Sequence, residues 1–253
     1  MIERFHTPSL FGQHNDIVAM QTFRHGGVSP EPWSSLNFGS HTGDSAERIA
    51  TNIGLVCRDL GIEPESLALG DQVHSTDILH ITSGGTYPGV DGFITDTPGV
   101  YPCILTADCF PVLIFDPVKR AVAAVHAGWK GTAGNIAGKA VALLNKTFGS
   151  LPANCIAFVG TGISAMAYEV GPEVAAVFKP QYLTALSNGN HTLNLALANT
   201  RQLSDAGLDE TRIGRSPFCT VLDNRHFFSY RKEQGVTGRM ISLIGLRPSS
   251  RAL

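Results

Sequence analysis

Three residues that can bind a soft or borderline metal ion stand at the ends of apolar, strand-like runs. They are His74 in Gln-Val-His, Cys109 in Thr-Ala-Asp-Cys and His126 in Ala-Val-His. Two imidazoles and a thiolate leave the fourth tetrahedral position of Zn²⁺ open, as a catalytic zinc site requires. The intervals of 35 and 17 residues between them match no metal-site signature. Buried histidines and an inert core cysteine are therefore the competing interpretation.

The segment after His126 reads Ala-Gly-Trp-Lys-Gly-Thr and leads from a strand-like run into an Ala- and Gly-rich helical pattern. A helix that starts after a glycine turn presents free backbone N–H groups and the positive end of its dipole. With Lys130 beside them, the N–H groups of Gly131 and Thr132 could hold a phosphate or carboxylate near a metal on His126. An ordinary strand-to-helix turn with an exposed lysine is the alternative.

Elements that position these residues can be read from the periodicity. Strand-length apolar runs cover 17–23, 77–82, 92–95, 103–106, 112–115, 121–125, 156–159 and 240–246. Helical patterns cover 45–60, with Ser45 as N-cap, and 132–148, 172–179 and 194–206. Turns between 91 and 127 are too short for helices, which predicts antiparallel hairpins rather than βαβ units. We expect one mixed α/β (α+β) domain over 1–253.

The composition excludes several classes of protein. The 253 residues carry 19 Lys and Arg against 21 Asp and Glu, so no basic field exists to hold nucleic acid or an anionic membrane. Five single cysteines without a Cys-x-x-Cys pair argue against a disulfide framework. The first residues lack a secretory signal pattern. These observations predict a soluble, cytoplasmic protein, monomeric or homodimeric, with no nucleic-acid or membrane partner.

Ten short stretches, in one order along nearly the whole chain, identify a known family. They are Arg24-His-Gly-Gly-Val-Ser29, Ser35-Leu-Asn-Phe-Gly39, His41-Thr-Gly-Asp44, Asp71-Gln-Val-His74, Asp91-Gly-Phe-Ile-Thr95, Leu105-Thr-Ala-Asp-Cys-Phe-Pro-Val112, His126-Ala-Gly-Trp-Lys-Gly131, Tyr168-Glu-Val-Gly171, Phe227-Phe-Ser-Tyr-Arg231 and Thr237-Gly-Arg239. The chain resembles the YfiH-type laccase-domain family, also called the multicopper polyphenol oxidase or purine nucleoside phosphorylase family.

The resemblance implies an α/β sandwich with a mixed, largely antiparallel sheet, shared with a group of cysteine hydrolases. It also implies a metal bound by His74, Cys109 and His126, the same trio that the residue types suggest. Its activities include phosphorolysis of adenosine, inosine and methylthioadenosine, adenosine deamination and an older laccase assignment. Some bacterial members are linked instead to removing misincorporated amino acids from peptidoglycan precursors.

Phosphorolysis requires a phosphate held against C1′ of the ribose and contacts to the purine. Arg24, Lys130 and Arg239 are the cations in motif-like segments, and a planar guanidinium suits bidentate phosphate contacts. Asn37 and His41 lie in a glycine-punctuated loop and could contact base or ribose. Solvated arginines and, for Asn37, an Asx-turn are the alternatives.

Deamination would use the same metal. Zinc lowers the pKa of a bound water to about 7, and that water could attack C6 of adenine while a carboxylate transfers the proton. Asp108, beside Cys109, and Glu169 are the candidate carboxylates, although Asp108 could instead support a turn or a ligand. The His-x-Glu and Pro-Cys-x-x-Cys signature of known zinc deaminases is absent from the sequence.

Two further chemistries remain open. Nine histidines with no His-x-His pair are a poor basis for the copper cluster of a conventional laccase, although a single site could bind Cu. Cys109 could instead be a nucleophile with His126 as its base, which would make a hydrolase. We interpret the sequence first as a zinc-dependent purine nucleoside enzyme, with the thiol hydrolase and the copper oxidase as alternatives.

We expect Cys109→Ser to lose metal and activity together, while Ala or Ser is tolerated at Cys57, Cys103, Cys155 and Cys219. These four lie in apolar or strand-like settings without a histidine nearby in sequence. Elemental analysis and turnover of each purified variant measure this. Metal loss from a folded Cys103 variant would identify a different sulfur ligand. Full turnover of verified metal-free protein, with Cys109→Ser inactive, would favour the thiol nucleophile.

Overall fold

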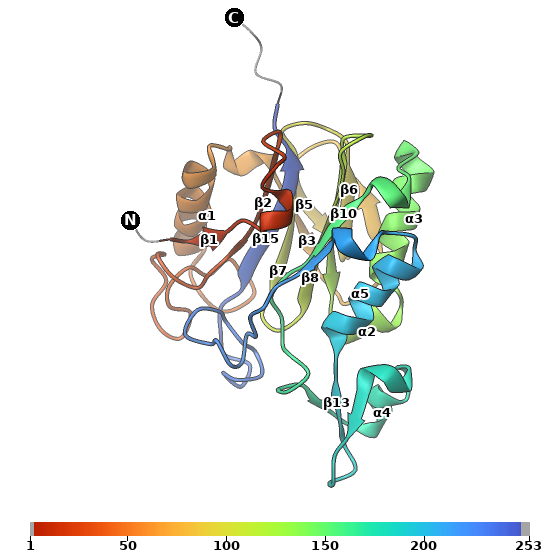
Figure 1. Cartoon of the computed structure of the whole chain (residues 1–253). Coiled ribbons are helices and arrows are strands. Elements are labelled where there is room, and N and C mark those ends of the chain that lie inside the picture. The colour runs from red at the N-terminus through yellow and green to blue at the C-terminus, as the bar shows by residue number, and fades with distance from the viewer. Residues whose placement is uncertain (1–2, 249–253) are drawn as a thin grey trace, which may run out of the picture.

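Two six-stranded sheets pack face to face in the computed structural model, which describes residues 3–248 (Figure 1). Helix α1 (Ala46–Leu60) covers the outer face of one sheet, and α3 (Ile136–Phe148) with α5 (Leu195–Asp205) covers the outer face of the other. Sheets and helices therefore form four layers. This confirms the expected mixed α/β fold.

The first sheet has the strand order β1-β2-β15-β7-β3-β5. Its strands are β1 (Phe5–His6), β2 (Ile17–Thr22), β15 (Met240–Leu246), β7 (Tyr101–Thr106), β3 (Leu67–Asp71) and β5 (Gly85–Pro88). Strand β15 pairs antiparallel with both β2 and β7, while β3 runs parallel to β7 and β5. The last described strand of the chain thus lies inside the sheet, between two strands from earlier segments.

The second sheet has the order β14-β10-β8-β9-β6-β4. Its strands are β14 (Ile213–Arg215), β10 (Ile156–Val159), β8 (Phe110–Asp116), β9 (Ala121–Ala127), β6 (Gly92–Thr95) and β4 (Ile78–His80). The central pairs β10–β8, β8–β9 and β9–β6 are antiparallel, and both edge pairs are parallel.

A small third sheet projects from the body together with α4 (Pro172–Ala175), at the lower end in Figure 1. Its strands, in the order β11-β13-β12, are β11 (Glu169–Val170), β13 (His191–Leu193) and β12 (Leu183–Ala185). The remaining helices are α2 (Trp129–Ala133) and five 3₁₀ turns at Ser9–Phe11, Pro64–Ser66, Pro152–Asn154, Pro180–Tyr182 and Glu210–Arg212.

Strand β9 shows how the sequence places a functional side chain. All seven of its residues are buried, because one face packs under the helices and the other against the opposite sheet. Ala121, Ala123 and Val125 join the core under α3 and α5, whereas Val122 and Ala124 join the core between the sheets. Side chains alternate along a strand, so His126 continues the inter-sheet row at the end of the sandwich.

Most sequence-based elements are confirmed, and the strands at 92–95, 156–159 and 240–246 have the expected bounds. The helix at 45–60 is α1, where the Ser45 side chain accepts a hydrogen bond from the N–H of Arg48. The expected helix at 132–148 is instead two helices, since Asn135 adopts a left-handed φ of 61° between them. Helix α4 ends at Ala175, well short of 179.

The hairpin expectation for 91–127 holds only for β8 and β9. Strands β7 and β8 follow each other closely but belong to different sheets, so the chain turns a corner between them rather than closing a hairpin. Asp108 has a left-handed φ of 92° at this corner. A short connection does not distinguish a hairpin from a strand pair that switches sheets. Strands β3, β5 and β14 and the third sheet were not expected from the sequence.

In the described part of the chain, no helix combines the length and the apolar character needed to cross a membrane.

We expect Leu113→Ala to lower the free energy of unfolding by about 2–5 kcal/mol, because it removes a buried side chain between the two sheets. Leu79→Ala is the matched control, since Leu79 is 38% exposed on edge strand β4 and its loss costs about 1 kcal/mol or less. Urea unfolding of both variants measures the difference. Equal destabilisation would contradict this description of the core.

Candidate functional site

His74, Cys109 and His126 come together at one end of the sandwich. Their ligand atoms all lie within 4.8 Å of one another. His74 follows β3 of the first sheet, Cys109 lies at the corner between β7 and β8, and His126 is on β9 of the second sheet. Burial increases along this series, from an exposed His74 to a buried His126. The trio expected from the sequence is therefore one cluster with both sheets contributing.

Asp91, directly before β6, organises this cluster. Its Oδ1 lies 2.7 Å from Nδ1 of His126, so Nδ1–H donates to the carboxylate and Nε2 is left for a ligand. The same carboxylate accepts the N–H groups of Val73, His74 and Ser75 at 3.2, 3.0 and 2.6 Å. These bonds hold His74 in its left-handed φ of 60°. One buried side chain thus fixes both histidines.

The charges of the cluster are coupled. Burial raises the pKa of Asp91, but hydrogen bonds from His126 and Ser75 outweigh it and lower the pKa to about 2. Burial likewise raises the pKa of Cys109, yet attraction to His126 and hydrogen bonds with both histidines lower it to about 6. The thiolate and Asp91 in turn raise the pKa of His126 against the effect of burial. The metal-free cluster therefore favours a thiolate beside an imidazolium at neutral pH.

Gly128, at the start of α2, makes room for this arrangement. A Cβ atom at this position would lie 3.0 Å from Sγ of Cys109 and 3.2 Å from Cδ2 of His74. A side chain at this position would therefore push Cys109 or His74 aside by a few tenths of an ångström, whereas glycine leaves both in place. A donor set of two nitrogens and one sulfur, packed this closely and oriented by a carboxylate, fits a tetrahedral zinc ion with one open position.

The trio opens into a cavity of about 990 Å³. Aromatic rings of Phe38, Tyr168 and Tyr230 line it, together with the cations Arg231 and Arg239. Burial and the nearby Cys109 raise the pKa of Tyr168 to about 12, so its phenol is protonated at neutral pH. The cavity joins a metal-binding set, ring faces and positive charge in one space, a combination suited to an aromatic, anionic or phosphate-dependent substrate.

Three of the other expected site residues line the cavity: His41, Arg239 and Asp108. Within the described residues Arg239 uses Nη1 on the carbonyls of Thr237 and Gly238, at 3.1 and 2.9 Å, and stacks near Tyr230. Burial and the charge of Arg239 lower the pKa of His41, which makes it a neutral imidazole at pH 7. The side chains of His41 and Arg239 can therefore contact a ligand beside the trio.

Asp108 also lines the cavity, but its carboxylate is committed to holding loops. Oδ1 accepts the hydroxyls of Thr220 and Ser229 at 2.6 and 2.7 Å, and Oδ2 accepts the N–H of Arg231 at 2.6 Å. The carboxylate has these three donors and is only 9% exposed, so it holds the surrounding loops against the corner beside Cys109. Of the two interpretations from the sequence, proton transfer and support of a turn or ligand, these contacts favour the second.

Glu169 and Lys130 lie outside the cavity. The exposed Glu169 carboxylate, on β11, accepts the side-chain amides of Asn188 and Asn190 in the turn between β12 and β13. Lys130 is exposed, with its ammonium 5.6 Å from the centre of the Trp129 ring. Helix α2 begins at Trp129, so the N–H of Thr132 donates to Gly128 inside the helix instead of facing an anion. Of the two N–H groups in the expected anion site, that of Thr132 is therefore used inside the helix, and the site at 130–132 lies apart from the cavity.

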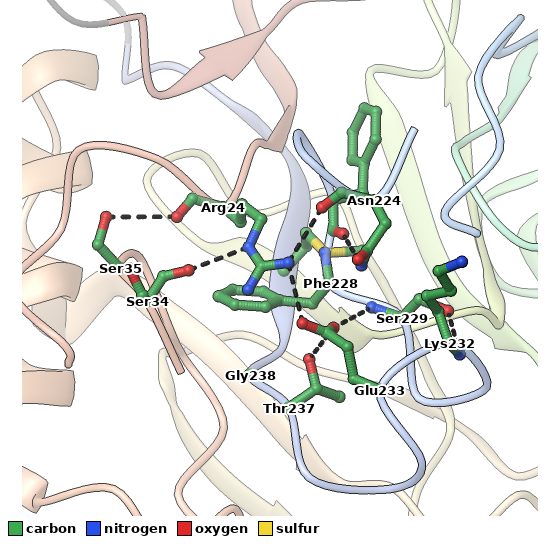
Figure 2. A network of polar contacts seen from close by, with 12 residues as sticks. Arg24, Ser34, Ser35, Asn224, Phe228, Ser229, Lys232, Glu233, Thr237 and Gly238 are labelled. Atoms are coloured by element: carbon green, nitrogen blue, oxygen red, sulfur yellow. Dashed lines mark hydrogen bonds and ion pairs between the residues drawn. The ribbon is translucent and has the colours of Figure 1, made fainter. Parts of the chain in front are cut away.

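Asn37 and Arg24 are also taken up by internal contacts. Asn37 is fully buried, and its Oδ1 accepts the N–H groups of Gly39 and Arg239, each at 2.9 Å. Arg24 lies outside the cavity, where its guanidinium pairs with Glu233 at 3.0 Å and covers the ring of Phe228 (Figure 2). Neither residue lines the cavity, and these contacts instead assign both side chains to holding the surrounding loops.

Four residues of the site received no role from the sequence. Asp91, Tyr168, Tyr230 and Arg231 all lie in the stretches that carry the family resemblance, but spacing alone does not connect them with the trio. The one local signal for Asp91 is an acidic residue directly before a strand, Asp-Gly-Phe-Ile-Thr. That pattern is equally typical of a turn.

The fold and this cavity define a single-domain α/β protein with a candidate metal centre. Residues 18–247 match the family described as multi-copper polyphenol oxidoreductase laccase. The chain belongs to this family, which confirms the resemblance found in the sequence.

Relatives in this family carry a different name from the family itself. The chain is 38% identical over 228 residues to a protein of Deinococcus radiodurans named purine nucleoside phosphorylase, with 89% of this chain and 87% of that protein covered. It is 34% identical over 241 residues to purine nucleoside phosphorylase YfiH of Escherichia coli, covering 92% and 96%. The crystal structure of YlmD from Geobacillus stearothermophilus matches with a TM-score of 0.93 and 32% identity, covering 98% of each chain.

We expect Asp91→Asn to weaken zinc binding by about 10- to 100-fold, because an amide NH₂ facing Nδ1 shifts the proton to Nε2, the atom that must face the metal. Competition with a chromophoric chelator measures the affinity. Asp116→Asn is the control, since this buried aspartate caps the β8–β9 turn through the N–H groups of Val118 and Lys119. Wild-type zinc affinity in a folded Asp91→Asn variant would show that Asp91 does not orient the ligand.

Proposed function

We propose that the protein is a zinc-dependent purine nucleoside phosphorylase that converts adenosine or inosine and phosphate into free base and ribose 1-phosphate, and methylthioadenosine and phosphate into adenine and the corresponding methylthioribose 1-phosphate. The observation that carries the proposal is that one cavity contains the His74, Cys109 and His126 set, three aromatic rings and two arginines. The names of the relatives point to the same reaction. Nucleoside and phosphate are the proposed ligands, and the whole chain is proposed to act as one catalytic domain, as a monomer or homodimer.

Each part of the cavity matches one requirement of phosphorolysis. The phosphate oxygen must reach C1′ as the bond from C1′ to the purine nitrogen breaks, and the base leaves with that electron pair and takes up a proton. We assign the phosphate to Arg239, with Arg231 nearby, because a guanidinium gives charge-assisted contacts to phosphate oxygens. Stacking on Tyr168 and Tyr230 would hold the purine. His41, neutral at pH 7, is the residue assigned to exchange a proton with the ligand.

The metal is proposed to be zinc, with copper as the alternative, because two imidazoles and a thiolate suit both ions. Zinc held there would supply a Lewis acid that polarises a substrate oxygen or an attacking water. Asp91 and Gly128 would keep the ligands in place. Adenosine deamination is proposed as a second activity of the same centre, since it needs the metal and a purine site but no phosphate.

A second candidate is a thiol hydrolase, which one observation favours. Cys109, with its pKa lowered to about 6, lies beside His126, and His126 is oriented by Asp91. This is the order of groups found in activated cysteine nucleophiles. A multicopper oxidase ranks third, because within residues 3–248 one set of three His, Cys, Asp or Glu ligands is found, whereas a copper cluster needs several.

We expect Arg239→Met to slow phosphorolysis about 10- to 100-fold while adenosine deamination keeps most of its rate, because a charge-assisted contact worth about 1.5–3 kcal/mol is lost only where phosphate takes part. Base release, ribose 1-phosphate and ammonia are followed separately, with and without phosphate. Arg201→Met is the control, since Arg201 lies on the exposed side of α5 and pairs there with Glu210 of the following turn.

The outcomes separate the candidates. Equal loss of both reactions in Arg239→Met would assign Arg239 to the nucleoside or to the fold. Base release that needs no phosphate would exclude phosphorolysis. Absence of purine chemistry, together with cleavage of a muramyl-type amide by metal-free protein, would establish the hydrolase instead.

A further inference from the structure

Arg24 connects three segments of the chain without reaching the cavity. Its Nε donates to the carbonyl of Ser34 at 3.0 Å, and its Nη1 donates to the carbonyl of Asn224 and to Oε1 of Glu233, each at 3.0 Å (Figure 2). The guanidinium carbon lies 4.5 Å from the centre of the Phe228 ring. The side chains of Arg24 and Glu233 are only 12% and 21% exposed. This pair is therefore shielded from solvent far more than an ordinary surface ion pair.

Glu233 also holds the turn formed by residues 229–237, which carries Tyr230. Its Oε2 accepts the N–H of Ser229 at 2.9 Å and the hydroxyl of Thr237 at 2.5 Å, so one carboxylate spans the turn from both ends (Figure 2). Tyr230 lies just inside one end of the turn, and Arg239 lies just beyond the other. Both line the cavity.

The position of Arg239 depends directly on this turn. Its Nη1 donates to the carbonyls of Thr237 and Gly238. Thr237 is also the residue whose hydroxyl donates to Glu233. The side chain of Arg239 also lies 5.6 Å from the Tyr230 ring. A shift of Thr237 would therefore move the cation relative to the aromatic wall of the cavity.

We propose that Arg24 and Glu233 are positioning residues that set the distance between Arg239 and Tyr230, and thereby the affinity of the cavity for phosphate. This inference rests on the proposed function for its kinetic readout. Without Arg24, the partly buried Glu233 loses its counter-ion. An uncompensated charge in such a setting costs free energy, which favours movement of the carboxylate toward water. The turn then loses its restraint while the metal ligands, which lie on other segments, keep theirs.

The test compares Arg24→Met, Glu233→Gln and the double variant. We expect the KM for phosphate to rise about tenfold in Arg24→Met, with kcat within about threefold of wild type and zinc content unchanged. The double variant should have the same KM for phosphate as Glu233→Gln alone, because both changes break the same ion pair between Arg24 and Glu233. Arg24→Lys should recover part of the loss, since an ammonium can pair with Glu233 but cannot form the forked contacts.

Hydrogen exchange of residues 227–239 gives a readout that does not depend on any activity. Exchange in this segment should increase in Arg24→Met and stay at the wild-type level in Arg4→Met. Arg4 is the matched control, because it is a partly buried arginine that pairs with Asp59 and makes its other contact to Gly26.

The outcomes decide whether Arg24 positions the turn. Wild-type KM for phosphate and unchanged exchange in folded Arg24→Met would overturn the positioning role. Loss of kcat with an unchanged KM for phosphate would do the same, because a role through the phosphate site requires KM to change. If the wild-type protein shows no phosphorolysis, the proposed function fails, and the exchange measurement alone decides whether Arg24 positions the turn. Should Arg24→Met not fold, Arg24→Lys and Glu233→Gln carry the same comparison.

Discussion

The buried carboxylate of Asp91 accepts hydrogen bonds from both segments that carry a histidine of the trio. Three successive N–H groups, from Val73 to Ser75, and Nδ1 of His126 converge on its two oxygens. His74 comes from the first sheet and His126 from the second, so this one side chain joins the sheets where the candidate metal centre lies. A carboxylate with this many donors stays ionised despite burial, which keeps Nδ1 of His126 protonated and Nε2 directed at the ligand.

Two further carboxylates, the buried Asp108 and the partly buried Glu233, organise the rest of the cavity in the same way. Asp108 fastens the loops at Thr220, Ser229 and Arg231, and Glu233 fastens the turn at Ser229 and Thr237. These loops have no strand partners along most of their length, so their backbone groups need side-chain partners instead. The sheets provide a rigid base, and three acidic side chains convert irregular loops into a defined wall. Asp108, one of the two carboxylates considered for proton transfer, therefore accepts hydrogen bonds from hydroxyl and backbone donors.

The sequence was sufficient for the trio because the residue types and the family motifs agree. The residue types alone left buried histidines and a core cysteine open as an alternative, the motifs imply His74, Cys109 and His126 as ligands, and the metal-binding cluster has these members. Spacing could not show which cations face the cavity. Arg24 and Arg239 both lie in motif-like segments, but Arg24 has an internal counter-ion, Glu233, more than two hundred residues away. Such pairings depend on tertiary packing, as does the corner at Asp108, which local sequence does not distinguish from a hairpin.

The location of β15 has a consequence for how the protein folds. This strand, Met240–Leu246, inserts between β2 and β7, whose other ladders come from the first half of the chain. Until it arrives, the first sheet is split, and two buried strand edges are left open to association with other chains. Contacts across such long stretches of sequence form late and slowly. Arg239 precedes β15 directly, so the positive wall of the cavity takes shape in the same late step that closes the sheet.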